Sequence, residues 1–238
     1  MLYSCLFQFT YCGSNMTLRR LFLLILLVLL PPGMLSAAEQ NVELQNGSTV
    51  KLFFFEPPSE GEPPPLAIFI AGGSSNEFMA KAQFWLGKEF VDRGWAIAVP
   101  MSADGSLFSA AGDSRIEQII GQLHASHTLH DSKPLLVGMS SGGSEAMAIA
   151  ALNPHAYRGV VATPGRIKTD TALQELNKLP FYIRVGEKDD FKWDRILESM
   201  TQRLRLAGAE VDSAIVQDAR HVFQIDWESL ENWLGKLK

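Results

Sequence analysis

Short apolar runs alternate with longer segments of helical spacing from residue 66 to the C-terminus, and this alternation limits the possible folds strongly. Short runs of this kind are typical of strands buried on both faces of a sheet. The expected strands are Leu66–Ala71, Trp95–Met101, Pro134–Val137, Tyr157–Ala162, Phe181–Val185 and Val211–Gln217. The expected helices are Asn76–Asp92, Arg115–His124, Gly143–Leu152, Thr171–Lys178, Trp193–Leu206 and Trp227–Leu237. The alternation predicts an α/β fold with a mostly parallel sheet and helices on both faces.

An antiparallel hairpin is expected before the first of these strands. The pair Asn46-Gly47 lies between two runs of strand-forming residues within Asn41–Phe55, and Asn-Gly is a strong short-range hairpin signal. The proline-rich stretch Pro57–Pro65 that follows is expected to be an exposed connection, because too little chain precedes it to form a separate core.

The first 38 residues are expected to be a cleavable export signal. Arg19 and Arg20 form a positive segment, Leu21–Leu30 is an unbroken apolar run, and Ser36 and Ala38 are small residues at positions −3 and −1 of a signal-peptidase site. We therefore expect cleavage after Ala38 and a periplasmic or secreted protein, with a single domain over residues 39–238.

The true start of the chain is expected at Met16, just ahead of the basic pair. A permanent membrane anchor is the alternative interpretation of the apolar run. A span needs roughly 20 apolar residues, whereas this run is interrupted by Pro31, Pro32 and Gly33. No stable membrane anchor is therefore expected.

The charge and the cysteines of the expected mature chain exclude some classes of protein. Both cysteines, Cys5 and Cys12, lie in the export signal, so stability must come from packing rather than from disulfides. Without Arg19 and Arg20 the chain keeps 19 basic side chains against 26 acidic ones, a net charge of −7. This balance gives no electrostatic reason to bind nucleic acid, and the oligomeric state stays open.

A Gly-x-Ser-x-Gly sequence, Gly138 to Gly142, is the sharpest chemical signal in the chain. It follows an expected strand and precedes an expected helix, which is the context of a nucleophile elbow. The turn strains the backbone of Ser140, and glycines on either side avoid collisions with neighbouring backbone. The helix directs its free N–H groups and its positive dipole end at the site. Ser140 is the candidate nucleophile.

A serine hydroxyl needs a base within hydrogen-bond reach and a third group that orients the base. His221 follows the last expected strand, and Asp189 follows the strand before it. Both lie at carboxyl ends of parallel strands, as Ser140 does. One edge of the sheet is therefore expected to bring the three side chains together.

From about residue 41 to its end, the chain resembles small members of the α/β-hydrolase superfamily of serine esterases, lipases and peptidases. The elbow and the chain order Ser, Asp, His carry the resemblance. It implies that Ser140 attacks a carbonyl carbon, that His221 acts first as general base and then as general acid, and that Asp189 orients the imidazole. The expected reaction is hydrolysis of an ester through an acyl-enzyme, without a metal or organic cofactor.

The resemblance also implies two backbone donors for the oxyanion. One is Ser141, directly after the nucleophile. The other is expected from the glycine-rich loop Ala71–Ser75, with Gly73 or Ser74 as the donor. Many relatives have histidine where Ala71 stands, so this loop departs from the pattern.

Each candidate has a competing interpretation. Ser140 could be a tight-turn serine, and Asp190 or Asp194 could replace Asp189 as the acid beside the histidine. Asp218 is expected to cap or orient the histidine loop. A peptidase or amidase with the same triad is the alternative among enzymes. From a different class, the alternative is a non-catalytic binding protein with the same fold.

A second constellation, His124, His127 and His130 with Asp131, has the spacing of a metal site on a helix. It leads into the amino end of the next strand, on the opposite edge from the nucleophile, and no second acidic or thiol ligand is evident. A solvated helix end is therefore the expected interpretation, without a metal.

The links after the strands are short and leave little room for a lid. We expect an open cleft for a small-molecule or polymer-linked acyl substrate, lined by residues such as Met101, Phe108, Pro164, Phe191 and Trp193.

Overall fold

The computed structural model describes residues 38–58, 61–73, 76–102, 104–110, 112–168, 173 and 175–237. Residues 35–238 form one compact unit. The expected export signal lies outside the described residues apart from Ala38, the first residue of the first strand. Cleavage after Ala38 and a start at Met16 stay predictions.

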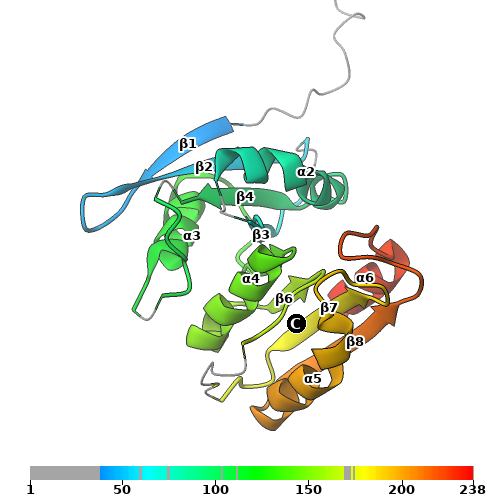
Figure 1. Ribbon diagram of the computed structural model, residues 1–238. Helices are drawn as coiled ribbons and strands as arrows, with labels where there is room; N and C mark the ends of the chain where they lie inside the picture. The colour runs from blue at the N-terminus through cyan, green and yellow to red at the C-terminus, as the bar shows by residue number, and fades with distance from the viewer. Residues whose placement is uncertain are drawn as a thin grey trace, which may run out of the picture. The chain divides into compact units, whose positions relative to one another are not determined.

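An eight-stranded sheet forms the centre of this unit (Figure 1), in the order β1-β2-β4-β3-β5-β6-β7-β8. The strands are β1 (Ala38–Glu43), β2 (Thr49–Phe55), β3 (Leu66–Ile70), β4 (Ala96–Met101), β5 (Leu135–Gly138), β6 (Gly159–Ala162), β7 (Pro180–Gly186) and β8 (Glu210–Val216). β1 pairs with β2 and β2 pairs with β4 in antiparallel fashion, and every pair from β4 to β8 is parallel. The mostly parallel sheet is therefore confirmed.

The turn between β1 and β2 confirms the expected hairpin. Gly47 has a φ of +78°, a conformation that glycine adopts without steric cost. The Leu44 N–H donates to the carbonyl of Ser48 over 2.8 Å. In register, Val42 lies opposite Val50, and both side chains are buried.

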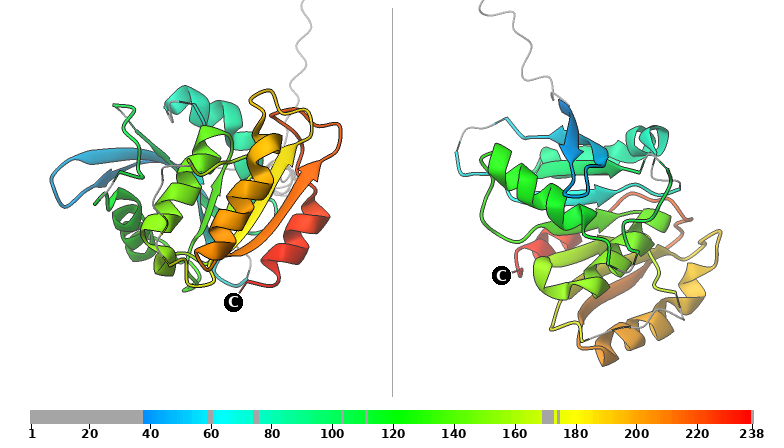
Figure 2. Two further views of the ribbon diagram at one scale, coloured as in Figure 1. Left: turned by 60° about the horizontal axis from the view of Figure 1, so that its bottom comes forward. Right: turned by 90° about the vertical axis from the view of Figure 1, so that its left-hand side faces the viewer.

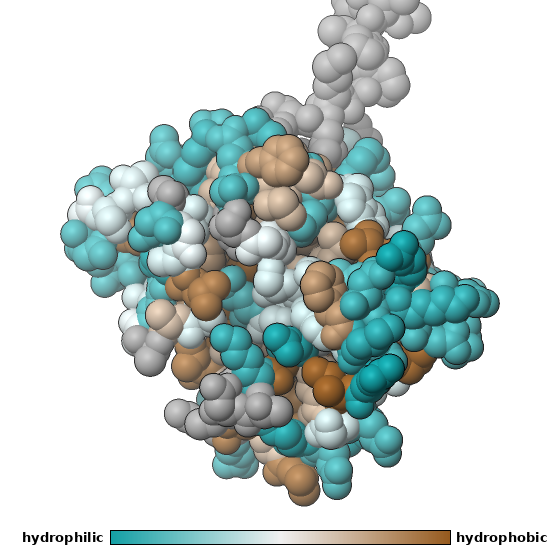
Figure 3. Space-filling model, viewed as in Figure 1, coloured by the Kyte–Doolittle hydropathy of each residue, from teal (hydrophilic) through white to brown (hydrophobic). Residues whose placement is uncertain are grey.

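Helices cover both faces of the sheet, as Figures 1 and 2 show. They are α2 (Glu77–Val91), α3 (Arg115–Ser126), α4 (Ser141–Leu152), α5 (Leu197–Leu206) and α6 (Trp227–Leu234), with short 3₁₀ turns η1 (Pro154–Ala156) and η2 (Trp193–Ile196). None of the helices in the described part of the chain is long and apolar enough to cross a membrane. On the face drawn in Figure 3, hydrophobic side chains form separate patches among hydrophilic ones.

Two hydrophobic clusters fill the spaces between the sheet and its two helical layers. Along β3, Ile68 and Ile70 belong to the cluster that contains side chains of α3, α4 and α5. Ala67 and Phe69 belong to the cluster that contains side chains of α2 and α6. All of β3 is inaccessible to solvent, because side chains alternate between two covered faces. The rigid centre of the sheet holds the loops at its carboxyl edge in place.

The structure contradicts the expected helix Thr171–Lys178. Its described residues, 173 and 175–178, are not helical. Asn177 and Lys178 have φ values of +48° and +60°, and the Lys178 N–H donates to the carbonyl of Gly208 over 2.8 Å. Hydrogen bonds to the turn after α5 thus replace the intrahelical bonds that the periodicity suggested. The expected helix Trp193–Leu206 is divided into η2 and α5.

Candidate active site

Ser140 lies on a tight turn between β5 and α4, as the elbow sequence predicts. Its φ of +59° and ψ of −126° form a strained conformation for a residue with a side chain. Its N–H donates to the carbonyl of Pro164 over 2.8 Å, so the loop after β6 supports the elbow from behind. The sequence reasoning missed this support from Pro164, because nothing local links the two segments.

The glycines of the elbow allow main chain to pack directly on main chain. A Cβ atom at Gly142 would lie 2.1 Å from the carbonyl oxygen of Ile70. A Cβ atom at Gly138 would lie 2.4 Å from the carbonyl oxygen of Gly142. No side-chain rotation can relieve contacts with backbone atoms, so both positions require glycine.

We expect Gly142→Ala to destabilise the protein by about 3 kcal/mol or more, because the new methyl group must displace the backbone of β3. Gly121→Ala is the matched control. Gly121 lies inside α3, and a Cβ atom there meets nothing within 4 Å. This control should stabilise the protein by roughly 0.5–1 kcal/mol through helix propensity. Urea unfolding of both variants measures the two effects, and equal effects would contradict the steric explanation.

The three candidate triad residues lie in one continuous chain of hydrogen bonds. The Nε2 atom of His221 is 2.8 Å from the Oγ atom of Ser140, and its Nδ1 atom is 2.7 Å from the Oδ2 atom of Asp189. The Asp189 side chain is inaccessible to solvent, and His221 is 7% exposed. In the sequence, His221 lies 81 positions from Ser140 and 32 positions from Asp189. The fold brings the three together at the carboxyl edge of the sheet.

Backbone amides hold the other carboxylate oxygen of Asp189. Its Oδ1 atom accepts from the N–H of Phe191 over 2.8 Å and from the N–H of Trp193 over 3.2 Å. The rings of these two residues stand edge-on to the imidazole of His221, with centroids 4.6 and 5.0 Å away. The same short segment therefore orients the acid and encloses the histidine.

Asp190 has a different environment from Asp189. Its carboxylate forms an ion pair with Arg220 at 2.5 Å, and hydrogen bonding from this guanidinium lowers the pKa of Asp190. Both side chains are exposed. Of the two neighbouring acids, Asp189 is the one whose carboxylate contacts the imidazole of His221.

Contacts between two loops fix the distance between acid and histidine. The Lys188 N–H donates to the carbonyl of Ala219 over 2.7 Å, and the Lys188 ammonium pairs with Asp218 at 2.7 Å. Asp218 has a φ of +58°, so it sits in the turn that leads to His221. This position agrees with the expected role of Asp218 in orienting the histidine loop.

Gly73 and Ser141, two of the expected oxyanion donors, lie in contact with each other beside Ser140. Ser141 is the first residue of α4, where an N–H has no partner within the helix. The Gly73 N–H donates to the Oγ atom of Ser141 over 2.6 Å. The Gly72 N–H donates to the buried amide of Gln83 over 2.7 Å. Ser74 lies outside the described residues, so its expected role stays a prediction.

The sequence reasoning used only the backbone of Ser141 and missed the role of Gln83. The Ser141 hydroxyl and the Gln83 amide hold the glycine-rich loop at two successive N–H groups. A glutamine on the buried face of α2 was the available signal for Gln83.

Ser141→Ala is expected to lower kcat about tenfold with little change in KM, because the Gly73 loop loses the contact that positions it. This is less than the roughly 10²- to 10³-fold effect of deleting an oxyanion donor itself. Ser141→Thr, which keeps the hydroxyl, serves as the control and should retain most of the rate. Steady-state kinetics of the two variants provide the measurement. A faster Ser141→Ala enzyme would mean that the hydroxyl competes with the oxyanion.

Glu145 anchors the loop between β4 and α3 to the helix that carries the nucleophile. It is 6% exposed, and its Oε1 atom accepts a hydrogen bond from the N–H of Phe108. Burial raises the pKa of Glu145 above its ordinary value. The loop is also held by Arg115, which donates to the carbonyl of Leu107 over 2.6 Å. As the only charged residue of α4, Glu145 was visible in the sequence but not singled out.

The raised pKa of Glu145 predicts that its ionisation lowers the stability of the folded protein as pH rises. The folded protein favours the neutral acid relative to the unfolded chain, so this contribution to stability is present at low pH and is lost as pH rises through the folded-state pKa. Glu145→Gln keeps an oxygen acceptor for Phe108 and removes this titration. We expect its stability relative to wild type to increase from pH 4.5 to pH 7.5. Urea unfolding at both values tests this, with exposed Glu228→Gln as the control.

The residues expected to line an open cleft are mostly buried, which corrects that prediction. Met101, Phe108, Pro164 and Trp193 are buried, and Phe191 is 65% exposed. They are buried because they support the site from within: Phe108 packs under Arg115, and Trp193 packs against the histidine. The exposed apolar side chain that the prediction missed is Val222, next to His221 and 60% exposed.

Two histidines of the alternative metal constellation, His127 and His130, have separate partners. His127 lies 3.0 Å from the amide of Gln40, and its ring packs on Phe54 at a centroid distance of 4.3 Å. His130 accepts from the N–H of Ser132 over 3.0 Å. Among the residues that the structure describes, no group of three or more potential ligands could hold a metal ion.

Comparison with known proteins agrees with this fold. The dienelactone hydrolase family model matches residues 96–232, more than half of the chain. No curated protein gives a significant match. The residues matched by the family model, 96–232, include Ser140, Asp189 and His221.

Solved structures of several hydrolases are similar in fold. A dienelactone hydrolase-like promiscuous phosphotriesterase from metagenomic libraries is 16% identical, with coverage of 86% of this chain and 99% of that chain and a TM-score of 0.66. A thermophilic esterase from the Planctomycetes species Thermogutta terrifontis is 15% identical, with 87% and 96% coverage and a TM-score of 0.64. The Bacillus cereus carboxylesterase is 18% identical, with 81% and 96% coverage and a TM-score of 0.57.

At sequence identities of 15–18%, similarity to these solved structures shows the fold alone. The match to the family model shows that the chain belongs to the family. The expected α/β-hydrolase fold is thereby confirmed. The chain belongs to the dienelactone hydrolase family of the α/β-hydrolase superfamily and is an ester hydrolase.

Proposed function

We propose that this hydrolase cleaves carboxylic esters through a Ser140–His221–Asp189 triad and a covalent acyl-enzyme. The unbroken path of hydrogen bonds from the buried Asp189 carboxylate through the imidazole to the Ser140 hydroxyl carries the proposal. A serine on a strained elbow with this path has the geometry that activates a hydroxyl at neutral pH.

In the proposed first half-reaction, the Ser140 oxygen attacks the ester carbonyl carbon while its proton passes to the Nε2 atom of His221. The Asp189 carboxylate stabilises the resulting imidazolium through the Nδ1–H. The backbone N–H of Ser141 stabilises the negative charge on the carbonyl oxygen, together with an N–H of the glycine-rich loop once the Gly73 N–H leaves the Ser141 Oγ atom to which it donates. The imidazolium then donates its proton to the leaving alcohol, which departs as the carbonyl re-forms.

In the second half-reaction, water replaces the alcohol. His221 accepts a proton from the water as its oxygen attacks the acyl-enzyme carbonyl, and the proton then passes to the Ser140 oxygen as the carboxylic acid leaves. Phe191 and Val222, the exposed apolar side chains beside the histidine, are placed to contact an apolar group of the substrate.

Labelling with a fluorophosphonate probe tests the proposed nucleophile. We expect the wild-type protein to be labelled at Ser140 and a folded Ser140→Ala variant to remain unlabelled. Mass spectrometry of the digested protein locates the label. Matched ester and amide substrates then compare the proposed esterase with a peptidase or amidase. Labelling at another serine, or none in a folded wild type, would contradict the proposal.

We further propose that the protein is exported to the periplasm or secreted. The basic pair, the apolar run and the small residues before position 39 support this. Fractionation of cells that express the full chain, with amino-terminal sequencing of the exported form, tests the proposal. A mature protein that begins at Glu39 is expected, and one retained in the cytoplasm with its first residues intact would contradict export.

A further inference from the structure

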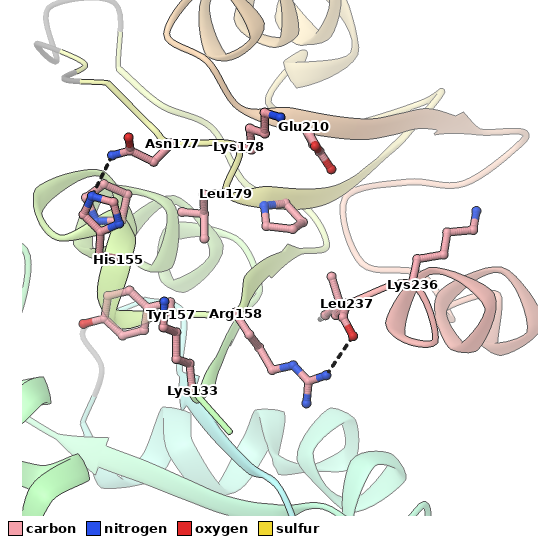
Figure 4. Close-up of a pocket in the computed structure, with 12 residues that line it drawn as sticks. Lys133, His155, Tyr157, Arg158, Asn177, Lys178, Leu179, Glu210, Lys236 and Leu237 are labelled. Atoms are coloured by element: carbon pink, nitrogen blue, oxygen red, sulfur yellow. Dashed lines mark hydrogen bonds between the residues drawn. The ribbon is translucent and has the colours of Figure 1, made fainter. Parts of the chain in front are cut away.

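A hollow lies at the opposite edge of the sheet from Ser140. It has a volume of about 410 Å³, within the usual range for small-molecule sites. Figure 4 shows side chains around it from the amino-terminal ends of β7 and β8, from the segments before β5 and β6, and from the end of the chain. The catalytic residues follow the carboxyl ends of these strands, so the hydrolytic reaction does not account for this hollow.

Four cationic side chains line the hollow, namely Lys133, Arg158, Lys178 and Lys236, against a single acid, Glu210. This local excess of positive charge contrasts with the net charge of −5 for the chain. None of the four forms an ion pair with a carboxylate in the described part of the chain. Cations that surround one hollow without a carboxylate partner favour an anionic ligand there.

Arg158 is the most constrained of these cations. One of its terminal nitrogens donates to the carbonyl of Leu237 over 3.3 Å, which fixes the guanidinium at the wall of the hollow. Its Nε atom is buried and has no hydrogen-bond partner among the described residues, and burial lowers the pKa of Arg158. An unsatisfied buried donor is costly. An anion in the hollow would contact the terminal N–H groups of this guanidinium rather than the Nε atom, and would offset the cost of holding the charge there.

Apolar groups complete the lining and indicate more than a bare ion. Tyr157, Leu179 and Pro180 contribute to the wall between the cations. Tyr157 is held in place because its hydroxyl donates to Glu117 over 3.1 Å. A hollow of this volume is larger than a single phosphate group. Its lining fits a molecule with an anionic end and a small apolar body.

We propose that this hollow binds a soluble small molecule that carries a phosphate or similar oxyanion group on an apolar body. Arg158 and Lys236 contact the oxyanion, and Lys133 and Lys178 add to the positive potential at the entrance. The seven residues of β7, at about 3.3 Å each, separate this site from the catalytic edge. The site is therefore independent of the hydrolytic reaction.

Isothermal titration calorimetry with phenyl phosphate, inorganic phosphate and phenol as probes tests the proposal. We expect saturable binding of phenyl phosphate, weaker binding of inorganic phosphate, and no binding of phenol. Arg158→Gln and Lys236→Gln should each weaken the binding of phenyl phosphate about tenfold, since each removes a charge-assisted hydrogen bond. Lys88→Gln is the matched control, because it removes one positive charge on α2 and should leave the affinity unchanged.

Circular dichroism and ester hydrolysis establish that each variant is folded, and neither should change because the site lies away from Ser140. If Arg158→Gln does not fold, Lys236→Gln and Lys178→Gln at the rim decide the question. Vesicles with and without an anionic phospholipid distinguish a lipid headgroup from a soluble ligand. Absence of saturable binding, binding unaffected by the Lys236→Gln change, or binding to anionic vesicles alone would each overturn the proposal.

Discussion

Replacing Ser140 with alanine is expected to lower kcat for ester hydrolysis about 10⁴- to 10⁶-fold. The substitution removes the oxygen that forms the acyl-enzyme. Alanine keeps the Cβ atom, and the Ser140 N–H that donates to the carbonyl of Pro164 is retained. The elbow itself should therefore persist, and stability should change by less than about 1 kcal/mol.

Steady-state kinetics on an activated ester measure the loss, and urea unfolding measures the stability. Ser144→Ala is the matched control, since its hydroxyl lies one helical turn beyond the nucleophile and donates to the Ser140 carbonyl over 3.2 Å. Its kcat should fall by less than about tenfold. A Ser140→Ala enzyme with near wild-type kcat would contradict the serine mechanism. If Ser140→Ala does not fold, the same measurement is made on Ser140→Gly.

Asp189→Asn is expected to lower kcat about 10⁴-fold without a comparable change in KM. The Oδ1 atom of Asp189 accepts hydrogen bonds from two backbone N–H groups, and an asparagine oxygen would keep this position. Its NH₂ group would then face the Nδ1 atom of His221, which must become an acceptor. The ring proton is forced onto Nε2, opposite the Ser140 hydroxyl, and the histidine can no longer accept the proton of the nucleophile.

Asp190→Asn separates this effect from a general loss of charge beside the histidine. It removes the same charge one residue away, breaks the exposed ion pair with Arg220, and keeps a side-chain oxygen that can accept from the backbone N–H of His221. Exposed ion pairs contribute little, so kcat should change by less than about threefold. The reverse result, a large loss of kcat for Asp190→Asn and a small one for Asp189→Asn, would show that Asp190 rather than Asp189 is the acid of the triad.

Much of the fold could be predicted from local patterns. The buried strands around β3 and β5 are apolar on both faces, and Asn46-Gly47 specified the hairpin, so composition and turn chemistry were sufficient there. The segment Thr171–Lys178 was not predictable in the same way. Its periodicity matches a helix, but long-range hydrogen bonds to the turn after α5 decide its backbone.

The candidate site likewise has residues that local sequence patterns predicted and residues that only long-range contacts reveal. Ser140 was found because an elbow leaves a local trace in its flanking glycines, and His221 and Asp189 because they follow strands of a parallel sheet. The support of the elbow by Pro164 and the roles of Gln83 and the Ser141 hydroxyl were not predicted. Each acts through a contact with a segment distant in the sequence, and no local pattern encodes such a contact.

The sequence by itself determined the class of fold, the candidate nucleophile and the edge of the sheet where the candidate triad lies. Those properties follow from strand periodicity and from the steric demands of one tight turn. Only the tertiary structure decided that Asp189 rather than Asp190 faces the histidine, and that the aromatic side chains expected in a cleft are mostly buried beneath it. The path of the backbone determines the direction in which each side chain of a loop points. That path depends on packing between segments that are distant in the sequence.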